Sequence, residues 1–179
     1  MNKLSTIKNR PPYEPAYDFY KVIREALEDT HQNSHNKAHL RQLLSTLRDP
    51  KKQVNYPRIV DGYCKWWGRK SFGWFDPPTS IFSNAGVDVS INPELGLEFG
   101  GKKYTVKLYF KDDTLTKNRI ELVTQLMEHC LRPSVSPDVM MAVLDTRASK
   151  LFIGSESDPR LIAALKAELR YIAELWPQL

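Results

Sequence analysis

VDVSINPELGLEFGGKKYTVKLYF, residues 87–110, decides the fold of this chain. Hydrophobic and polar residues alternate on both sides of Gly100-Gly101, a period of two that is typical of strands with one buried face. Two such runs joined by Gly-Gly predict a β-hairpin with a two-residue turn. That turn sets the register of the two strands. It places Leu97 opposite Tyr104, Leu95 opposite Val106, and Ile91 opposite Phe110. Because the apolar side chains match along both runs, we expect one long central hairpin.

The chain after the hairpin continues as helix, strand, strand and helix. A helix capped by Thr114 or Thr116 is expected to run to about Leu131. The run VMMAVLD, residues 139–145, is apolar on both faces and predicts a buried strand. A short strand over 150–153 follows, and Asp158-Pro159 begins a final amphipathic helix.

The chain before the hairpin predicts three helices. Residues 1–15 contain three prolines and are expected to form an extended arm. Helical periodicity begins at Tyr17, a second helix ends near Arg48, and a third helix starts near Pro57 and ends at Gly68. Residues 69–86 are irregular, with one short strand near Ser80–Phe82.

These elements predict an α/β (α+β) fold. We expect a mixed sheet built on the long central hairpin, with helices on both faces and an N-terminal helical segment. Residues 16–179 form one α/β domain in this interpretation, with a helical part over 16–70 and a sheet-containing core over 71–179.

The composition excludes several classes of protein. The chain has 179 residues, of which 41% are hydrophobic and 26% charged, so one globular domain is expected rather than a disordered chain. The longest apolar run, Val139–Leu144, is far too short to span a bilayer, which excludes a membrane partner. The N-terminus has no secretory pattern, and Cys64 and Cys130 suit free thiols. We therefore expect a cytoplasmic protein.

Positive charge is concentrated in the first part of the chain. The net charge is +5, whereas residues 1–74 alone carry 14 Lys and Arg against 7 Asp and Glu. A basic surface of this kind suits DNA or RNA, and the alternative is a solvated helical surface.

The segment KWWGRKSFGWF mixes cations with aromatic rings. Lys65, Trp66, Arg69 and Lys70 are the predicted nucleic-acid-binding residues, because aromatic rings stack on bases while cations contact phosphates. The alternative, which we favour, is that Trp67, Trp74 and Phe75 form core where the third helix meets the sheet, and Trp66 could then be the exposed ring.

The polar face of the hairpin places charges opposite each other. The register puts Glu94 opposite Lys107 and Glu98 opposite Lys103. We favour a solvent-facing ladder of ion pairs, each of which contributes at most about 1 kcal/mol.

The same face also resembles a nuclease motif. Pro93-Glu94 followed by Thr105-Val106-Lys107 resembles a degenerate PD-(D/E)xK pattern of restriction-endonuclease-like nucleases, and the resemblance covers roughly residues 54–145. It implies that Glu94 holds Mg²⁺ and Lys107 activates water, with Thr105 standing where the family has a second carboxylate. Asp61 or Asp88 could supply the missing acid.

A second resemblance covers most of the chain. The blocks YPRIVDGYCKWWGRK, NPELGLEFGGKKYTVKLYFK and VMMAVLDTRASKLF are similar to a family of uncharacterised bacterial proteins. This similarity implies a bacterial origin and no particular chemistry.

Three histidines are spaced four residues apart, at His31, His35 and His39. On one continuous helix they would share a face and could bind Zn²⁺ or Ni²⁺. Because Asn33, Ser34 and Asn36 favour a turn instead, we predict surface histidines and no metal site.

Three functional hypotheses follow. The first is a non-catalytic or degenerate nuclease-like domain that binds nucleic acid through its basic N-terminal half and needs no cofactor. The second is a module for interaction with a protein partner. The third is an active nuclease with Mg²⁺ as its cofactor. We favour a protein that is not an enzyme, because Thr105 cannot supply an anionic metal ligand.

Overall fold

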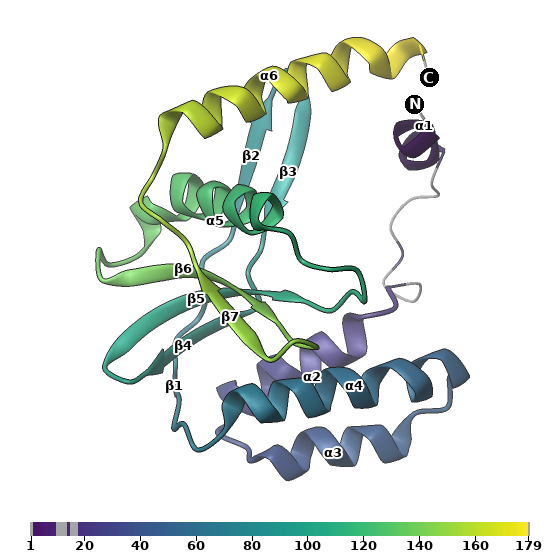
Figure 1. Ribbon diagram of the computed structural model, residues 1–179, viewed down its shortest axis with the longest axis vertical. Coiled ribbons are helices and arrows are strands. Elements are labelled where there is room, and N and C mark those ends of the chain that lie inside the picture. Colours follow the sequence, from purple (N-terminus) through teal and green to yellow (C-terminus); the bar gives the residue numbers. More distant parts are fainter. Residues whose placement is uncertain (1, 10–13, 15–17, 179) are drawn as a thin grey trace.

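The computed structural model describes residues 2–9, 14 and 18–178 and shows a mixed sheet between two helical layers (Figure 1). Helices α2, α3 and α4 lie below the sheet in that view, and α5 and α6 lie above it. The five-stranded sheet has the order β1-β4-β5-β6-β7, in which only β5 and β6 are parallel. Strands β2 and β3 form a separate two-stranded sheet. The predicted α+β class is therefore confirmed.

The helices and strands have the following bounds. The helices are α1 (Asn2–Lys8), α2 (Lys21–Gln32), α3 (Lys37–Thr46), α4 (Pro50–Trp67), α5 (Lys117–Leu131) and α6 (Pro159–Leu175). The strands are β1 (Gly73–Trp74), β2 (Ser80–Asn84), β3 (Val87–Ile91), β4 (Leu95–Phe99), β5 (Lys102–Tyr109), β6 (Val139–Asp145) and β7 (Lys150–Ile153).

The hairpin around Gly100-Gly101 has the predicted register but is shorter than expected. Leu97 pairs with Tyr104, and both glycines of the turn have positive φ, a conformation that glycine adopts without strain. The expected pairing of Ile91 with Phe110 is wrong, because Ile91 pairs with Ser80 in the β2–β3 sheet. Pro93 follows directly, and since proline has no N–H to donate, the ladder is interrupted and the chain changes sheets there.

Helix α4 begins earlier than predicted. Asp49 caps it by accepting hydrogen bonds from the backbone N–H groups of Lys51 and Lys52, and Pro50 occupies its first turn. Asp49-Pro50 therefore starts this helix, and the predicted start at Pro57 is wrong, since Pro57 lies inside the helix.

The N-terminus differs from the predicted extended arm over residues 1–15. Asn2–Lys8 is helical, and the Lys8 ammonium donates to the carbonyl of Trp176 at 2.7 Å, which ties α1 to the C-terminal end of the chain. Residues 1, 10–13 and 15 of that arm, and the expected helix start at Tyr17, lie outside the described residues.

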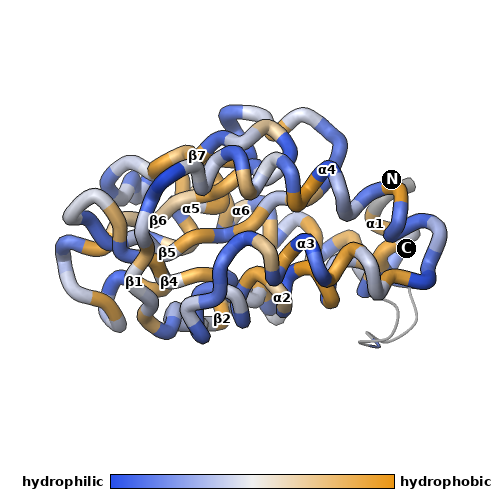
Figure 2. The backbone as a smooth tube through the Cα atoms, turned by 90° about the horizontal axis from the view of Figure 1, so that it is seen from below, coloured by the Kyte–Doolittle hydropathy of each residue, from blue (hydrophilic) through white to orange (hydrophobic). Residues whose placement is uncertain are grey.

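Two hydrophobic cores lie on the two faces of the sheet. The first joins α2, α3 and α4 to β4, β5 and β6, and the second joins α5 and α6 to the β2–β3 sheet and Met141. Figure 2 shows the hydrophobic segments in the interior and the hydrophilic ones mainly on the peripheral loops. Within the described residues, no helix combines the length and the hydropathy that crossing a membrane requires.

Candidate functional site

Glu94 and Lys107 meet as the hairpin register predicts. The Lys107 ammonium lies 2.6 Å from Glu94 Oε1 and also donates to the backbone carbonyl and the side-chain oxygen of Asn92, at 2.8 and 3.1 Å. The Glu94 side chain is only 5% exposed, whereas that of Lys107 is 31% exposed. The predicted solvent-facing ladder is therefore wrong at this pair, which is a largely buried ion pair.

The carboxylate of Glu94 extends the backbone ladder beyond the end of β4. Its Oε2 accepts the backbone N–H of Leu108 at 2.7 Å, while the backbone N–H of Glu94 donates to the carbonyl of Val106 at 3.0 Å. The chain before Glu94 is not paired with β5, so no backbone carbonyl of β4 is available to the N–H of Leu108. The Glu94 side-chain oxygen accepts that N–H instead. Glu94 therefore has a structural role that explains its burial.

The second predicted pair, Glu98 and Lys103, is in register but forms no ion pair within the described residues. Lys103 lies instead 3.8 Å from Asp138 in the loop before β6. The ladder is thus limited to one position.

Thr105 is fully buried between β4 and β6. Among the described residues, its hydroxyl is the one buried side-chain polar atom without a hydrogen-bond partner. A neutral hydroxyl is a weak ligand for Mg²⁺, which prefers carboxylates and water.

Glu28 on α2 is a carboxylate that the sequence analysis did not connect to this position. Burial raises the pKa of Glu28, and the negative charge of Glu94 raises it further. The two acids suggested from the sequence lie elsewhere: Asp61 is exposed on α4, and Asp88 accepts a hydrogen bond from Ser83 at 2.6 Å on β3. Only tertiary packing brings Glu28 close to Glu94, and no sequence spacing signals it.

These residues do not fit a Mg²⁺ site. Both oxygens of Glu94 are engaged, by Lys107 and by Leu108, and the hydroxyl of Thr105 carries no charge. Glu28 supplies no second ligand beside Glu94 in this arrangement, because burial and the charge of Glu94 both raise the pKa of Glu28 and so disfavour a second negative charge there. The arrangement therefore has the properties of a structural ion pair.

The aromatic segment after α4 is packed into the core. Trp66 is 7% exposed and stacks on Phe72, with ring centroids 5.4 Å apart, so its ring cannot stack on a base. Trp66 is therefore not the exposed ring that the nucleic-acid hypothesis requires, because α4 turns Trp66 inward and leaves Trp67 half-buried.

Two lysines stabilise the C-terminal end of α4. Lys37 donates to the carbonyl of Gly68 at 2.5 Å, and Lys70 donates to the carbonyl of Trp66. Burial, together with the neighbouring charge of Lys37, lowers the pKa of Lys70. Cations are favourable at a helix C-terminus, so both lysines already have local partners.

Lys65 and Arg69 remain exposed at the same end of α4. In the part of the chain that the structure describes, neither side chain forms an ion pair. Lys65 and Arg58 line a cavity of about 410 Å³ between α4 and the turn after β6, together with Arg147 and two aspartates, Asp61 and Asp112.

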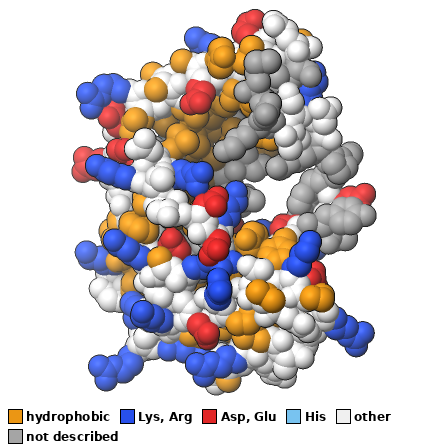
Figure 3. Space-filling model, turned by 45° about the vertical axis from the view of Figure 1, so that its right-hand side comes forward, with side chains coloured by type: hydrophobic (Ala, Val, Ile, Leu, Met, Phe, Trp, Pro, Cys, Tyr) orange, Lys and Arg blue, Asp and Glu red, His pale blue; other side chains and the backbone are white. Residues whose placement is uncertain are grey.

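The basic excess of the N-terminal half is confined to α3, α4 and the turn that follows. Residues 37–70 contain nine Lys and Arg and two Asp, a net charge of +7, whereas residues 1–36 are neutral overall. We call residues 37–70 the basic layer. Lys and Arg side chains project from the lower end of the molecule in Figure 3, where Figure 1 places α3 and α4.

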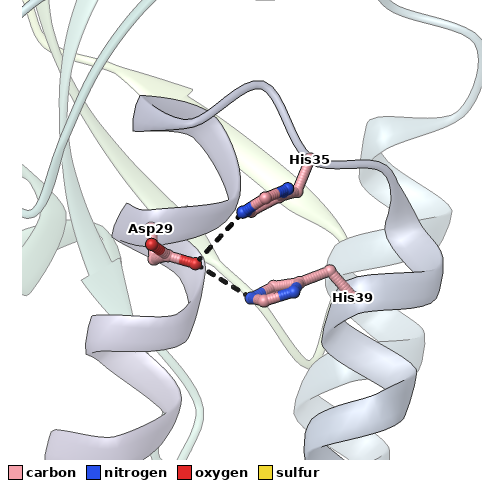
Figure 4. Close-up of side chains that lie close together, drawn as sticks. All are labelled: Asp29, His35 and His39. Carbon is pink, nitrogen blue, oxygen red and sulfur yellow. Dashed lines mark ion pairs between the residues drawn. The ribbon is translucent and has the colours of Figure 1, made fainter.

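The three spaced histidines have two different environments. His31 is buried, and its Nε2 lies 2.5 Å from the hydroxyl of Tyr63; burial lowers the pKa of His31 to about 4. His35 and His39 lie at the surface, and both rings approach the carboxylate of Asp29 (Figure 4). The predicted turn thus separates His31 from the other two histidines and brings Asp29 to them, which the histidine spacing alone does not show.

No protein-family model, curated protein or solved structure matches this chain.

Proposed function

We propose that this protein binds double-stranded nucleic acid through the basic layer and that it is not catalytic. The observation that supports the proposal is the confinement of a +7 charge to residues 37–70, on two helices at one end of the molecule. Cations on a folded surface bind phosphates by releasing counterions, and this contribution is independent of base sequence.

The surface of the basic layer suits a polyanion better than a protein partner. Protein interfaces depend on aromatic or aliphatic anchors in a central patch. In the described part of the layer, the one large hydrophobic side chain that is clearly exposed is Val54, at 68%. Lys65, Arg69 and Arg58 are exposed on α4 and the turn that follows.

The burial of Trp66 favours a duplex over a single strand. Sequence-tolerant binding of single strands relies on exposed aromatic rings that stack on bases. With the Trp66 ring buried against Phe72, contact by this layer is limited to phosphates and sugars. We therefore expect binding that depends steeply on salt and weakly on base sequence.

The test is fluorescence anisotropy of a labelled duplex of about 20 base pairs between about 50 and 200 mM KCl, in which affinity should fall steeply with salt. The variant Lys65→Glu/Arg69→Glu should weaken binding and reduce the salt slope by about one for each phosphate that the variant no longer binds. The matched control, Lys117→Glu/Arg170→Glu, makes the same change of charge at exposed residues outside the layer and should bind normally.

Two outcomes contradict this proposal. Equal weakening in both double variants would show a general effect of net charge rather than a defined surface. Absence of duplex binding at the lowest salt concentration would favour a module that contacts a protein partner.

The alternative of an active nuclease has one supporting observation, the meeting of Glu94 and Lys107 on a hairpin within a helix–strand–hairpin–helix–strand order. We expect no cleavage of plasmid DNA or RNA with Mg²⁺ or Mn²⁺. Metal-dependent cleavage that survives repurification and is abolished in Glu94→Gln would replace our proposal.

A further inference from the structure

Asp29, His35 and His39 form a compact cluster of potential metal ligands at the junction of α2 and α3. One ligand atom from each residue lies within 4.8 Å of the others. Nε2 of His39 lies 2.9 Å, and Nε2 of His35 lies 3.7 Å, from Oδ2 of Asp29. Both imidazoles thus point at the same carboxylate oxygen, as Figure 4 shows.

The turn between the helices builds this arrangement. Ser34 has φ of 54°, and the backbone N–H of His35 donates to the carbonyl of Thr30 at 2.8 Å, which returns the chain over the end of α2. Asn36 caps α3, so that His39 lies in its first turn. The rings of His35 and His39 stack with centroids 4.4 Å apart.

The carboxylate of Asp29 is held from its other side. Its Oδ1 accepts a hydrogen bond from the side-chain amide of Asn33 at 2.7 Å, which leaves Oδ2 directed at the two histidines. Outer hydrogen bonds of this kind orient ligands in metal sites and raise their affinity for the ion.

The spacing and the chemistry both suit Zn²⁺. Ligand atoms about 2.0–2.1 Å from a tetrahedral zinc ion lie about 3.3 Å apart, so small side-chain rotations bring these three atoms into place. Two imidazoles and one carboxylate are a ligand set that zinc accepts, with a fourth position left for water. The side chains are 38–44% exposed, which gives an ion free access.

We propose that Asp29, His35 and His39 bind one Zn²⁺ ion. The ion joins α2 to the first turn of α3 and so fixes the start of the basic layer against the rest of the fold. Water occupies its fourth coordination position.

The experiment uses the full chain without a polyhistidine tag, at about pH 8, where imidazole in water is neutral. Titration with zinc chloride against a chromogenic chelator should give one site with micromolar affinity. His35→Ala, His39→Ala and Asp29→Asn should each weaken binding at least about tenfold. His129→Ala removes an exposed histidine from α5 and should bind zinc normally.

A second measurement keeps the test valid if an alanine variant folds poorly. Zinc should raise the melting temperature of the wild-type protein by several degrees, because an ion that binds only the folded state stabilises it. Asp29→Asn, which keeps the size of the side chain, should lose this shift while its melting temperature without zinc stays close to that of the wild type. The absence of a saturable site, or equal loss of binding in His129→Ala, would overturn the proposal.

Discussion

Lys107 Nζ and Glu94 Oε1 lie 2.6 Å apart, in an ion pair that is almost closed to solvent on the glutamate side and one-third open on the lysine side. This asymmetry determines the effect of removing each partner. Without Lys107 the buried Glu94 carboxylate loses its ion-pair partner and keeps only the more distant charge of Arg24, whereas without the Glu94 charge the flexible lysine can reach water.

Lys107→Met should therefore destabilise the protein by about 3 kcal/mol, the range expected for an uncompensated buried charge. Glu94→Gln should cost only about 1 kcal/mol, because the amide oxygen still accepts the N–H of Leu108. Urea denaturation of both variants measures the two values.

The stability of the double variant, compared with that of Lys107→Met, shows whether the two side chains interact. Glu94→Gln/Lys107→Met has no buried charge, so it should be more stable than Lys107→Met alone. Additive losses would show that the two side chains act independently and that the pair is a surface contact.

Replacing Leu97 or Val106 by Asp should unfold the domain, since both side chains are fully buried and the two strands of the hairpin carry them into the same core. Circular dichroism during heating is the measurement. Lys102→Asp at the exposed end of the turn serves as the control and should melt within a few degrees of the wild type.

Gly62→Ala tests the contact between α4 and the turn after β6. A Cβ atom at Gly62 would lie 2.0 Å from the backbone carbonyl oxygen of Thr146, so the helix and the turn must separate. We expect a loss of about 3 kcal/mol, although alanine is intrinsically the better helix former. Asp61→Ala, at the exposed neighbouring position, should be nearly neutral. Stabilisation by Gly62→Ala would mean that α4 packs differently.

Glu28→Gln should stabilise the protein slightly at about pH 7. Burial and then the charge of Glu94 raise the pKa of Glu28 above its ordinary value of 4.5. As the pH rises above 4.5, the unfolded chain loses this proton while the native state retains it, so stability falls through this interval. Gln removes that penalty, by a few tenths of a kcal/mol because Glu28 is partly exposed to solvent.

The pH dependence distinguishes this effect from a general one. The advantage of Glu28→Gln should disappear at about pH 4, where Glu28 is largely protonated in both states. Glu25→Gln, which removes an exposed acid paired with Lys21 at 3.6 Å, should show no advantage at either pH. Destabilisation by Glu28→Gln at neutral pH would contradict the prediction and indicate a favourable role for the charged carboxylate.

The sequence alone predicted the features that depend on residues close together in the chain: the register of the hairpin, the starts of two helices and the burial of one strand. Gly100-Gly101 determined the register of β4 and β5, because only this turn geometry brings the two apolar faces together. Asp158 marked the start of α6, and Thr116 was one of two candidate caps for α5, since a side-chain oxygen at these positions accepts an unpaired backbone N–H. The apolar run of β6 predicted its burial, because a strand covered on both faces has no polar side.

Only the tertiary structure decided which strand pairs with which, which face of α4 is buried and which distant side chains meet. Strand β3 alternates in the same way as β4, and its pairing with β2 depends on where the chain turns at Pro93. The phase of α4, which buries Trp66, follows from its packing on the sheet. The burial of Glu94 and the convergence of Asp29 with His35 and His39 likewise depend on segments that fold over each other. A sequence pattern records which residues share a face, whereas contacts between segments depend on the packing of the whole chain.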